Sequence, residues 1–225
     1  MIKAVIFDMD GLMFDTERLL YQAWDYAGEK MNIGKAGHMA VETLGISTAD
    51  SQSIWYAHYG EAYNQQELRR YTYEFMETYY KEKGIPIKKG LQELLAYLKK
   101  NGYRTAVATS SSRVSLMRNL TAAGLKDEFD AFVTSDMVKV SKPSPDIYLK
   151  ACELLELQPE ECMALEDSLN GIKAAAGAKC KAIMIPDLVQ PNEETEKMLF
   201  AKCEHLGKVI EVLEKIKRQE NLHFE

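Results

Sequence analysis

The sequence predicts an α/β protein built on a doubly wound parallel sheet, with an all-helical segment inserted after the first strand. Two observations lead to this prediction. Short runs of β-branched and small apolar residues alternate with amphipathic helical patterns over most of the chain, which indicates right-handed βαβ units. Residues 17–84, by contrast, contain helical patterns only. The helical stretch therefore separates the first strand from the rest of the sheet.

The first predicted strand covers residues 3–7 and runs into Asp8-Met9-Asp10-Gly11. If strand geometry continues to Asp10, both carboxylates point to the same side of the sheet. Two such carboxylates resist ionising together unless a cation or a proton lies between them. Magnesium is the simplest cation to expect, because this hard ion takes oxygen ligands from carboxylates, water and phosphate. Taken alone, the same four residues are also ordinary turn chemistry.

The inserted stretch is predicted to form three helices, over residues 17–31, 48–59 and 64–83. The first and the third have apolar residues at the spacing of one buried helical face. The third ends at Gly84, a residue typical of helix C-termini. Aromatic residues such as Trp24 recur in these patterns, and we interpret them chiefly as packing between helices.

The alternating pattern of strands and helices begins after Gly84. Hydrophobic runs predict strands, and amphipathic periods between them predict helices that are often closed by glycine. The predicted strands are 105–108, 131–134, 163–165 and 182–185, and the main helices are 91–98, 145–157, 172–176 and 208–217.

The composition is that of an ordinary globular protein: 225 residues, 46% hydrophobic, with a net charge of −6. This acidic balance argues against a nucleic-acid partner, and no stretch is apolar for long enough to cross a membrane. The chain opens directly into a strand without an apolar leader, which predicts a cytoplasmic protein. The cysteines are widely spaced, so we expect free buried thiols at Cys152, Cys162, Cys180 and Cys203.

Four polar segments follow the carboxyl ends of predicted strands, where doubly wound sheets bind their ligands. Each has an ordinary interpretation: a turn, a serine helix cap, a surface lysine, or acids at a helix start. Their shared place at one sheet edge instead favours a site for phosphate and metal. The segments are Asp8 with Asp10, Thr109-Ser110-Ser111-Ser112, Ser141-Lys142-Pro143 and Glu166-Asp167-Ser168.

In this order, the four segments resemble the motifs of the haloacid dehalogenase superfamily, in particular its β-phosphoglucomutase-like phosphatases. The resemblance covers the whole chain and includes Asp15-Thr16 after the first motif and Gly171 in the fourth. It implies a Rossmann-like phosphotransfer core formed by residues 1–15 and 86–225. Residues 16–85 would form an inserted all-helical cap domain.

The resemblance also implies the role of each acidic residue. Asp8 would be the nucleophile that forms an aspartyl-phosphate, and Asp10 would be the general acid and base. Mg²⁺ would be held by the Asp8 carboxylate, the Asp10 backbone carbonyl and Asp167, with Glu166 nearby. Because the superfamily's dehalogenases lack the second aspartate and the metal, Asp10 points to phosphoryl transfer.

The phosphate-binding residues follow from the same resemblance. Thr109 and the Ser110 amide would hold the phosphoryl oxygens, and Lys142 would neutralise Asp8 and the phosphate. Phosphoryl transfer depends on such positioning and charge neutralisation. We therefore expect a phosphoric monoester hydrolase: a magnesium-dependent phosphatase of a small phosphorylated metabolite, such as a sugar phosphate or a nucleoside monophosphate.

Two alternatives remain: a β-phosphoglucomutase-type sugar-phosphate mutase, and a non-catalytic binding protein on the same fold. An intact motif set argues against the second. The mutases that the chain resembles carry a cap histidine where this sequence has Leu20, and an arginine in a Gly-x-Ser-Arg segment. Here residues 45–48 read Gly-Ile-Ser-Thr, and a neutral side chain cannot replace a guanidinium at phosphate. This favours hydrolysis, although Arg69, Arg70 or a lysine of the cap could supply the charge from another direction.

Overall fold

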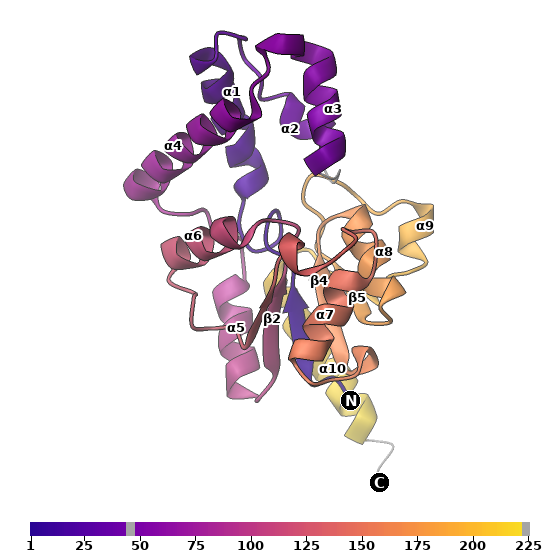
Figure 1. The fold of residues 1–225 in the computed structure, drawn as a ribbon. Helices are drawn as coiled ribbons and strands as arrows, with labels where there is room; N and C mark the ends of the chain where they lie inside the picture. The colour runs from indigo at the N-terminus through magenta and orange to yellow at the C-terminus, as the bar shows by residue number, and fades with distance from the viewer. Residues whose placement is uncertain (44–47, 222–225) are drawn as a thin grey trace. The chain divides into compact units, whose positions relative to one another are not determined.

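The computed structural model describes residues 1–43 and 48–221. The chain divides into two compact units (Figure 1). The core unit comprises Met1–Phe14 and Ile87–Glu225, and the helical unit comprises Asp15–Pro86. Residues 45–47 of the segment that was compared with the Gly-x-Ser-Arg of the mutases lie outside the described residues.

A parallel sheet forms the centre of the core unit. Its strand order is β3-β2-β1-β4-β5-β6, in which the first strand lies centrally and the chain winds outward on both sides. The α/β fold with a doubly wound parallel sheet is thus confirmed. The strands are β1 (Ala4–Phe7), β2 (Arg104–Ala108), β3 (Ala131–Val133), β4 (Cys162–Glu166), β5 (Lys181–Met184) and β6 (Ala201–Lys202).

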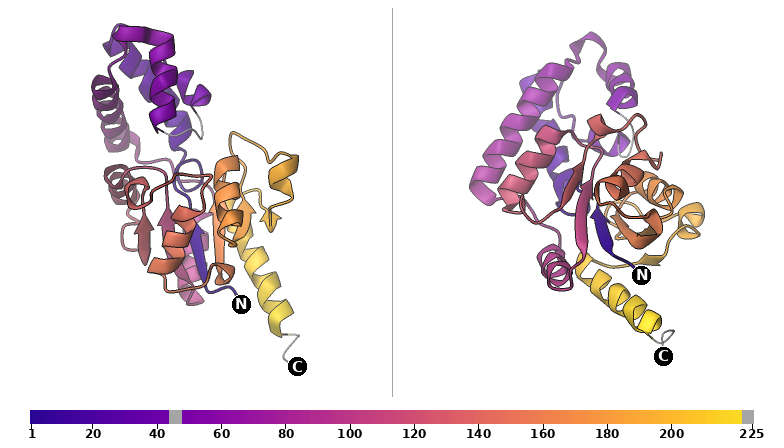
Figure 2. Two further views of the ribbon diagram at one scale, coloured as in Figure 1. Left: turned by 45° about the vertical axis from the view of Figure 1, so that its right-hand side comes forward. Right: turned by 60° about the horizontal axis from the view of Figure 1, so that its bottom comes forward.

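Helices cover both faces of this sheet (Figures 1 and 2). On one face, α7 and α8 bury small and branched side chains against alternate residues of the strands. On the other face lie α5 and α6, and α10 packs against α5. The helices of the core unit are α5 (Leu91–Lys100), α6 (Arg113–Ala123), α7 (Asp146–Leu154), α8 (Leu169–Gly177), α9 (Glu193–Glu196) and α10 (Val209–Asn221).

The register of the sheet brings the polar strand ends together. All four residues of β1 are fully buried, as expected for the central strand of a parallel sheet. Phe7 at the end of β1 lies opposite Val107 on β2 and Leu165 on β4. The next residue, Asp8, donates its amide to the Leu165 carbonyl over 3.0 Å. The first carboxylate therefore leaves the sheet beside the end of β4.

Strand geometry does not continue to Asp10, so that premise of the sequence analysis is wrong. The chain turns between Met9 and Phe14. The Met13 amide donates to the Met9 carbonyl, and the Gly11 amide donates to the Phe14 carbonyl. Gly11 adopts φ 81°, a left-handed conformation that glycine enters without a side-chain clash. Because of this turn, Asp8 and Asp10 do not share the alternation of one strand, and each has its own neighbours.

Some element boundaries also differ from prediction. Helix α8 starts at Leu169, three residues earlier than expected, because the Ser168 hydroxyl caps it by accepting the Gly171 amide. The short elements α9 and β6 were not predicted. The four cysteines are free and buried, which confirms the prediction for these residues.

The helical unit contains α1 (Thr16–Lys30), α2 (Met39–Glu42), α3 (Thr48–Tyr59) and α4 (Gln65–Lys83). Its core is formed by small, apolar and aromatic residues around Trp55, which is 1% exposed. The Trp24 ring meets Trp55 edge-on at 5.0 Å, so Trp24 is a packing residue of this unit. In the described part of the chain, no helix combines the length and apolarity that a bilayer span requires.

The residues that precede α1 and α4 differ in how they cap their helices. The side chain of Asn64 caps α4 by accepting the amides of Gln66 and Glu67. Asp15 precedes α1, but its carboxylate makes no capping hydrogen bond and accepts from Arg18 over 2.8 Å instead.

Candidate active site

Lys142 lies at the centre of a buried ionic cluster at the carboxyl ends of the central strands. Its ammonium donates to Asp8 Oδ1 over 2.5 Å and to Glu166 Oε1 over 2.6 Å. It also donates to the Ala108 carbonyl at the end of β2 over 3.1 Å. The Lys142 side chain is only 7% exposed. Lys142 is thus a buried cation beside Asp8 and not a surface lysine.

Asp8, Glu166 and Asp167 form a group of carboxylates that could hold a metal ion. Each offers an oxygen, and these oxygens lie within 4.8 Å of one another at buried positions. Like charges so close resist ionising together, and a divalent cation would relieve that repulsion. An all-oxygen set suits a hard ion such as Mg²⁺. The residues therefore fit the predicted cofactor.

The charges of the cluster are strongly perturbed. The pKa of Asp8 is raised to about 8, chiefly by burial and in part by Glu166, while Lys142 acts to lower it. Burial acts to lower the pKa of Lys142, but the carboxylates of Asp8 and Glu166 override this effect and raise it above its usual value. Lys142 therefore stays a cation, whereas the anionic form of Asp8 needs further positive charge nearby.

The Asp10 carboxylate is held by a different neighbour. The Ser111 hydroxyl donates to Asp10 Oδ2 over 2.7 Å. The Ser111 amide donates to the hydroxyl of Thr109 over 3.0 Å, and Thr109 is 1% exposed. Ser110, two residues after the end of β2, is exposed. Ser112, in contrast, is a plain helix cap that accepts the Ser115 amide.

Tyr148 is a site residue that the sequence analysis missed. Its hydroxyl donates to Glu166 Oε1 over 2.6 Å, and its ring centroid lies 5.2 Å from the Lys142 ammonium. The other oxygen of Glu166 accepts the Ser168 hydroxyl over 3.0 Å. Both oxygens of Glu166 thus accept hydrogen bonds, which fix the carboxylate. The fixed carboxylate in turn positions the ammonium of Lys142. No sequence signal marks Tyr148, because it occupies one of the buried positions of the amphipathic helix α7. Ser111 was visible only as part of the serine run.

Gly171 explains how the Glu166 carboxylate fits against α8. A Cβ atom at this position would lie 1.9–2.0 Å from the carboxyl atoms of Glu166, so only glycine leaves room for it. We expect Gly171→Ala to displace the carboxylate, to destabilise the protein by about 1–3 kcal/mol and to lower activity. Urea unfolding and turnover measurements would check this. Gly177→Ala in the same helix is the control, because its nearest neighbour would lie at 3.6 Å; equal losses in both variants would contradict the packing argument.

The fold and the motif order define the class of protein. A doubly wound sheet is interrupted by a helical unit after β1, and four polar segments follow the strands in order. The sequence model of the haloacid dehalogenase-like hydrolases matches residues 2–179. The chain belongs to this family, and the predicted family membership is confirmed.

Named relatives and a solved structure agree with this assignment. The chain is 32% identical to hexitol phosphatase B of Escherichia coli K12, over 82% of this chain and 84% of that one. It is 31% identical to the β-phosphoglucomutase of Bacillus subtilis 168, over 81% and 82% of the two chains. The crystal structure of CbbY from Rhodobacter sphaeroides with phosphate superposes with a TM-score of 0.80 at 28% identity, covering 93% and 96%. The chain is thus similar to a phosphatase and to a sugar-phosphate mutase.

Proposed function

We propose that this protein is a magnesium-dependent phosphatase that hydrolyses a small phosphorylated metabolite, such as a sugar phosphate or a nucleoside monophosphate, through an aspartyl-phosphate. The observation that carries the proposal is the buried contact of Lys142 with Asp8 and Glu166. A buried lysine locked to a carboxylate at the end of the central strand is poorly explained by stability alone, since desolvating such ions is costly. It is well explained by the need to neutralise a nucleophile and a phosphate.

In the first step, a carboxylate oxygen of Asp8 attacks phosphorus, and the bond from phosphorus to the substrate's ester oxygen breaks. Asp10 gives its proton to that leaving oxygen. Asp10 has a hydrogen-bond partner of its own, because its carboxylate accepts the Ser111 hydroxyl. Lys142 offsets the negative charge on Asp8 and on the phosphoryl group throughout the transfer.

In the second step, water attacks phosphorus and the bond to Asp8 breaks. Asp10 takes the proton of this water as general base, and inorganic phosphate leaves. Thr109 and the Ser110 amide would hold the phosphoryl oxygens at the end of β2, as the family resemblance implies. The same group of residues is then ready for another substrate.

The metal would be held by the carboxylates of Asp8 and Asp167 and by the backbone carbonyl of Asp10, with Glu166 beside them. When bound, Mg²⁺ supplies positive charge that favours the anionic nucleophile and offsets charge on the phosphoryl group. Glu166 chiefly orients Lys142, because both its oxygens already accept hydrogen bonds within the protein.

We also propose that the helical unit, residues 16–85 in the predicted division, is the cap that selects the substrate.

The test of the proposed phosphatase function is a panel of phosphate esters with and without Mg²⁺, scored by released inorganic phosphate. Hexitol phosphates belong in this panel because a relative is a hexitol phosphatase. Magnesium-dependent release from at least one small monoester is expected. Release from none of them would favour the non-catalytic alternative.

The choice between phosphatase and mutase has its own test. Leu20 occupies the place of the mutase histidine, and it packs partly buried against Leu19, Ala23 and Met76 of the helical unit. Such an apolar residue cannot exchange protons with a substrate. With β-glucose 1-phosphate, Mg²⁺ and a trace of the bisphosphate, we expect free phosphate and no accumulation of glucose 6-phosphate. Faster formation of glucose 6-phosphate than of free phosphate would instead identify a mutase.

A further inference from the structure

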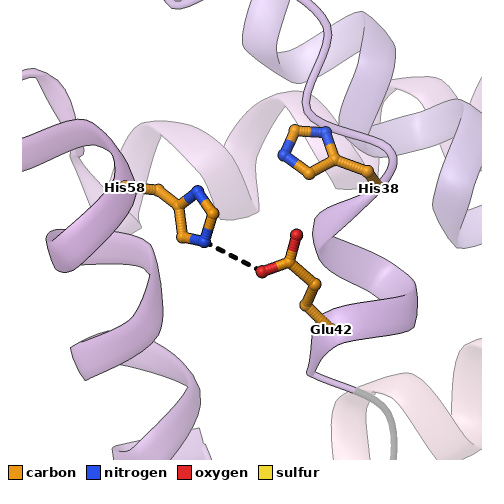
Figure 3. Close-up of side chains that lie close together, drawn as sticks. All are labelled: His38, Glu42 and His58. Atoms are coloured by element: carbon orange, nitrogen blue, oxygen red, sulfur yellow. Dashed lines mark ion pairs between the residues drawn. The ribbon is translucent and has the colours of Figure 1, made fainter.

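A second group of metal-ligating side chains lies in the helical unit, apart from the phosphotransfer residues in sequence and in chemistry. His38, Glu42 and His58 offer two imidazole nitrogens and a carboxylate oxygen, all within 4.8 Å of one another. Figure 3 shows the three side chains turned toward a common point between two helices. His58 Nε2 lies 2.8 Å from Glu42 Oε2, and the two imidazole rings are 6.0 Å apart.

The first two ligands are fixed by one turn of helix. His38 directly precedes α2 and its carbonyl accepts the Glu42 amide over 3.2 Å, so the two side chains are four residues apart on one helical face. The start of this turn is anchored to α1, since the Gly37 amide donates to Asp25 Oδ1 over 2.7 Å. Gly37 also passes close to the Tyr21 backbone, where a Cβ atom would lie 2.5 Å from the carbonyl oxygen. The turn therefore cannot shift freely.

The third ligand is fixed by the aromatic core of the helical unit. Met39 of α2 and Trp55 of α3 belong to the same buried cluster and are 0% and 1% exposed. Trp55 is further held by Tyr63, whose ring stacks on it at 5.3 Å. His58 follows Trp55 by three residues on α3. The buried cluster that contains both Met39 and Trp55 therefore sets the distance from His58 to the pair on α2.

We propose that His38, Glu42 and His58 form a binding site for a divalent transition-metal ion, with Zn²⁺ as its probe. Two imidazoles and one carboxylate are a ligand set that zinc uses in proteins, with a further position left for water. The side chains of His58 and Glu42 are 40% and 43% exposed, so an ion has access from solvent. Nitrogen ligands favour zinc-like ions over magnesium, which distinguishes this site from the all-oxygen group around Asp8.

A bound ion would tie α2 to α3, the helices on either side of residues 43–47. It would replace the exposed ion pair between His58 and Glu42. Three bonds to one ion would hold both helices more firmly than that exposed pair, since exposed ion pairs contribute little. The proposal concerns the helical unit alone and does not depend on the phosphatase chemistry.

The test is a titration of the full-length protein with Zn²⁺ in the presence of excess Mg²⁺, followed by calorimetry and by NMR of the histidine rings. We expect one zinc ion to bind with shifts in the ring signals of His38 and His58. Glu42→Gln and His58→Ala should each weaken this binding by about 100-fold or more, because removing even an outer partner of a ligand costs 10–100-fold. Glu61→Gln is the control, since Glu61 is an exposed acid of the same unit outside the group.

Two results would overturn the proposal. One is the absence of any zinc-induced change in the signals of His38 and His58 in the wild-type protein. The other is equal zinc affinity in the wild type, Glu42→Gln and Glu61→Gln, which would place the ion elsewhere. Circular dichroism of the metal-free variants checks their folding. Glu42→Gln carries the test if His58→Ala does not fold, because Glu42 is a surface residue whose replacement keeps its shape.

Discussion

Asp8→Asn is expected to reduce phosphate release by about 10⁴-fold or more, because the amide cannot attack phosphorus and the residues of a covalent mechanism act as a unit. The fold should persist, since asparagine has the same shape and Lys142 keeps its contacts with Glu166 and the Ala108 carbonyl. Turnover on the best substrate of the ester panel, with and without Mg²⁺, gives the measurement. Thermal unfolding of the same sample shows whether the variant is intact.

Asp127→Asn is a matched control for this substitution. Asp127 is exposed in the core unit and lies outside the buried cluster, so the same chemical change should leave turnover unaltered. An Asp8→Asn variant that releases phosphate at nearly the wild-type rate would show that the covalent mechanism is wrong. A folded but inactive Asp8→Asn beside an active Asp127→Asn would support the nucleophile.

Removal of the metal should have the second largest effect. EDTA is expected to abolish phosphate release and added Mg²⁺ to restore it, because a magnesium site has few protein ligands. Asp167→Asn should raise the Mg²⁺ concentration needed for half-maximal activity by about 100-fold or more. Calcium should inhibit, since it prefers more ligands and a looser geometry. Activity measured across a Mg²⁺ series in the wild type, Asp167→Asn and Asp127→Asn provides the comparison.

The stability of the metal-free variant separates a ligand from a structural residue. Carboxylate oxygens of Asp167, Asp8 and Glu166 lie within 4.8 Å of one another at buried positions, so removing the charge of Asp167 relieves repulsion between carboxylates. The melting temperature of Asp167→Asn in EDTA should therefore be no lower than that of the wild type. Full wild-type activity in EDTA would rule out magnesium dependence. An Asp167→Asn protein that melts early in EDTA would show that its lost activity reflects folding.

Much of the fold could be predicted because it depends on patterns that are local in the chain. The spacing of apolar residues in α5 and α4 predicts helices, and the hydrophobic runs of β1 and β4 predict buried strands. The order of these elements then restricts the topology, because parallel crossovers are right-handed. Short elements such as α2 and β6 have four and two residues and no period of their own, so only their packing partners define them.

The residues that gather at the sheet edge could be predicted from the order of the elements: strand ends carry Asp8, Thr109 and Glu166, and parallel strands end at the same edge. How these groups pair depends on contacts between elements that are distant in the chain. The turn at Gly11 directs the Asp10 carboxylate to Ser111, and Tyr148 reaches Glu166 from a helix on the face of the sheet. Likewise, the contact between His58 and Glu42 joins α3 to α2. Such contacts join residues far apart in the chain, and periodicity carries no information about them, because it describes one element at a time.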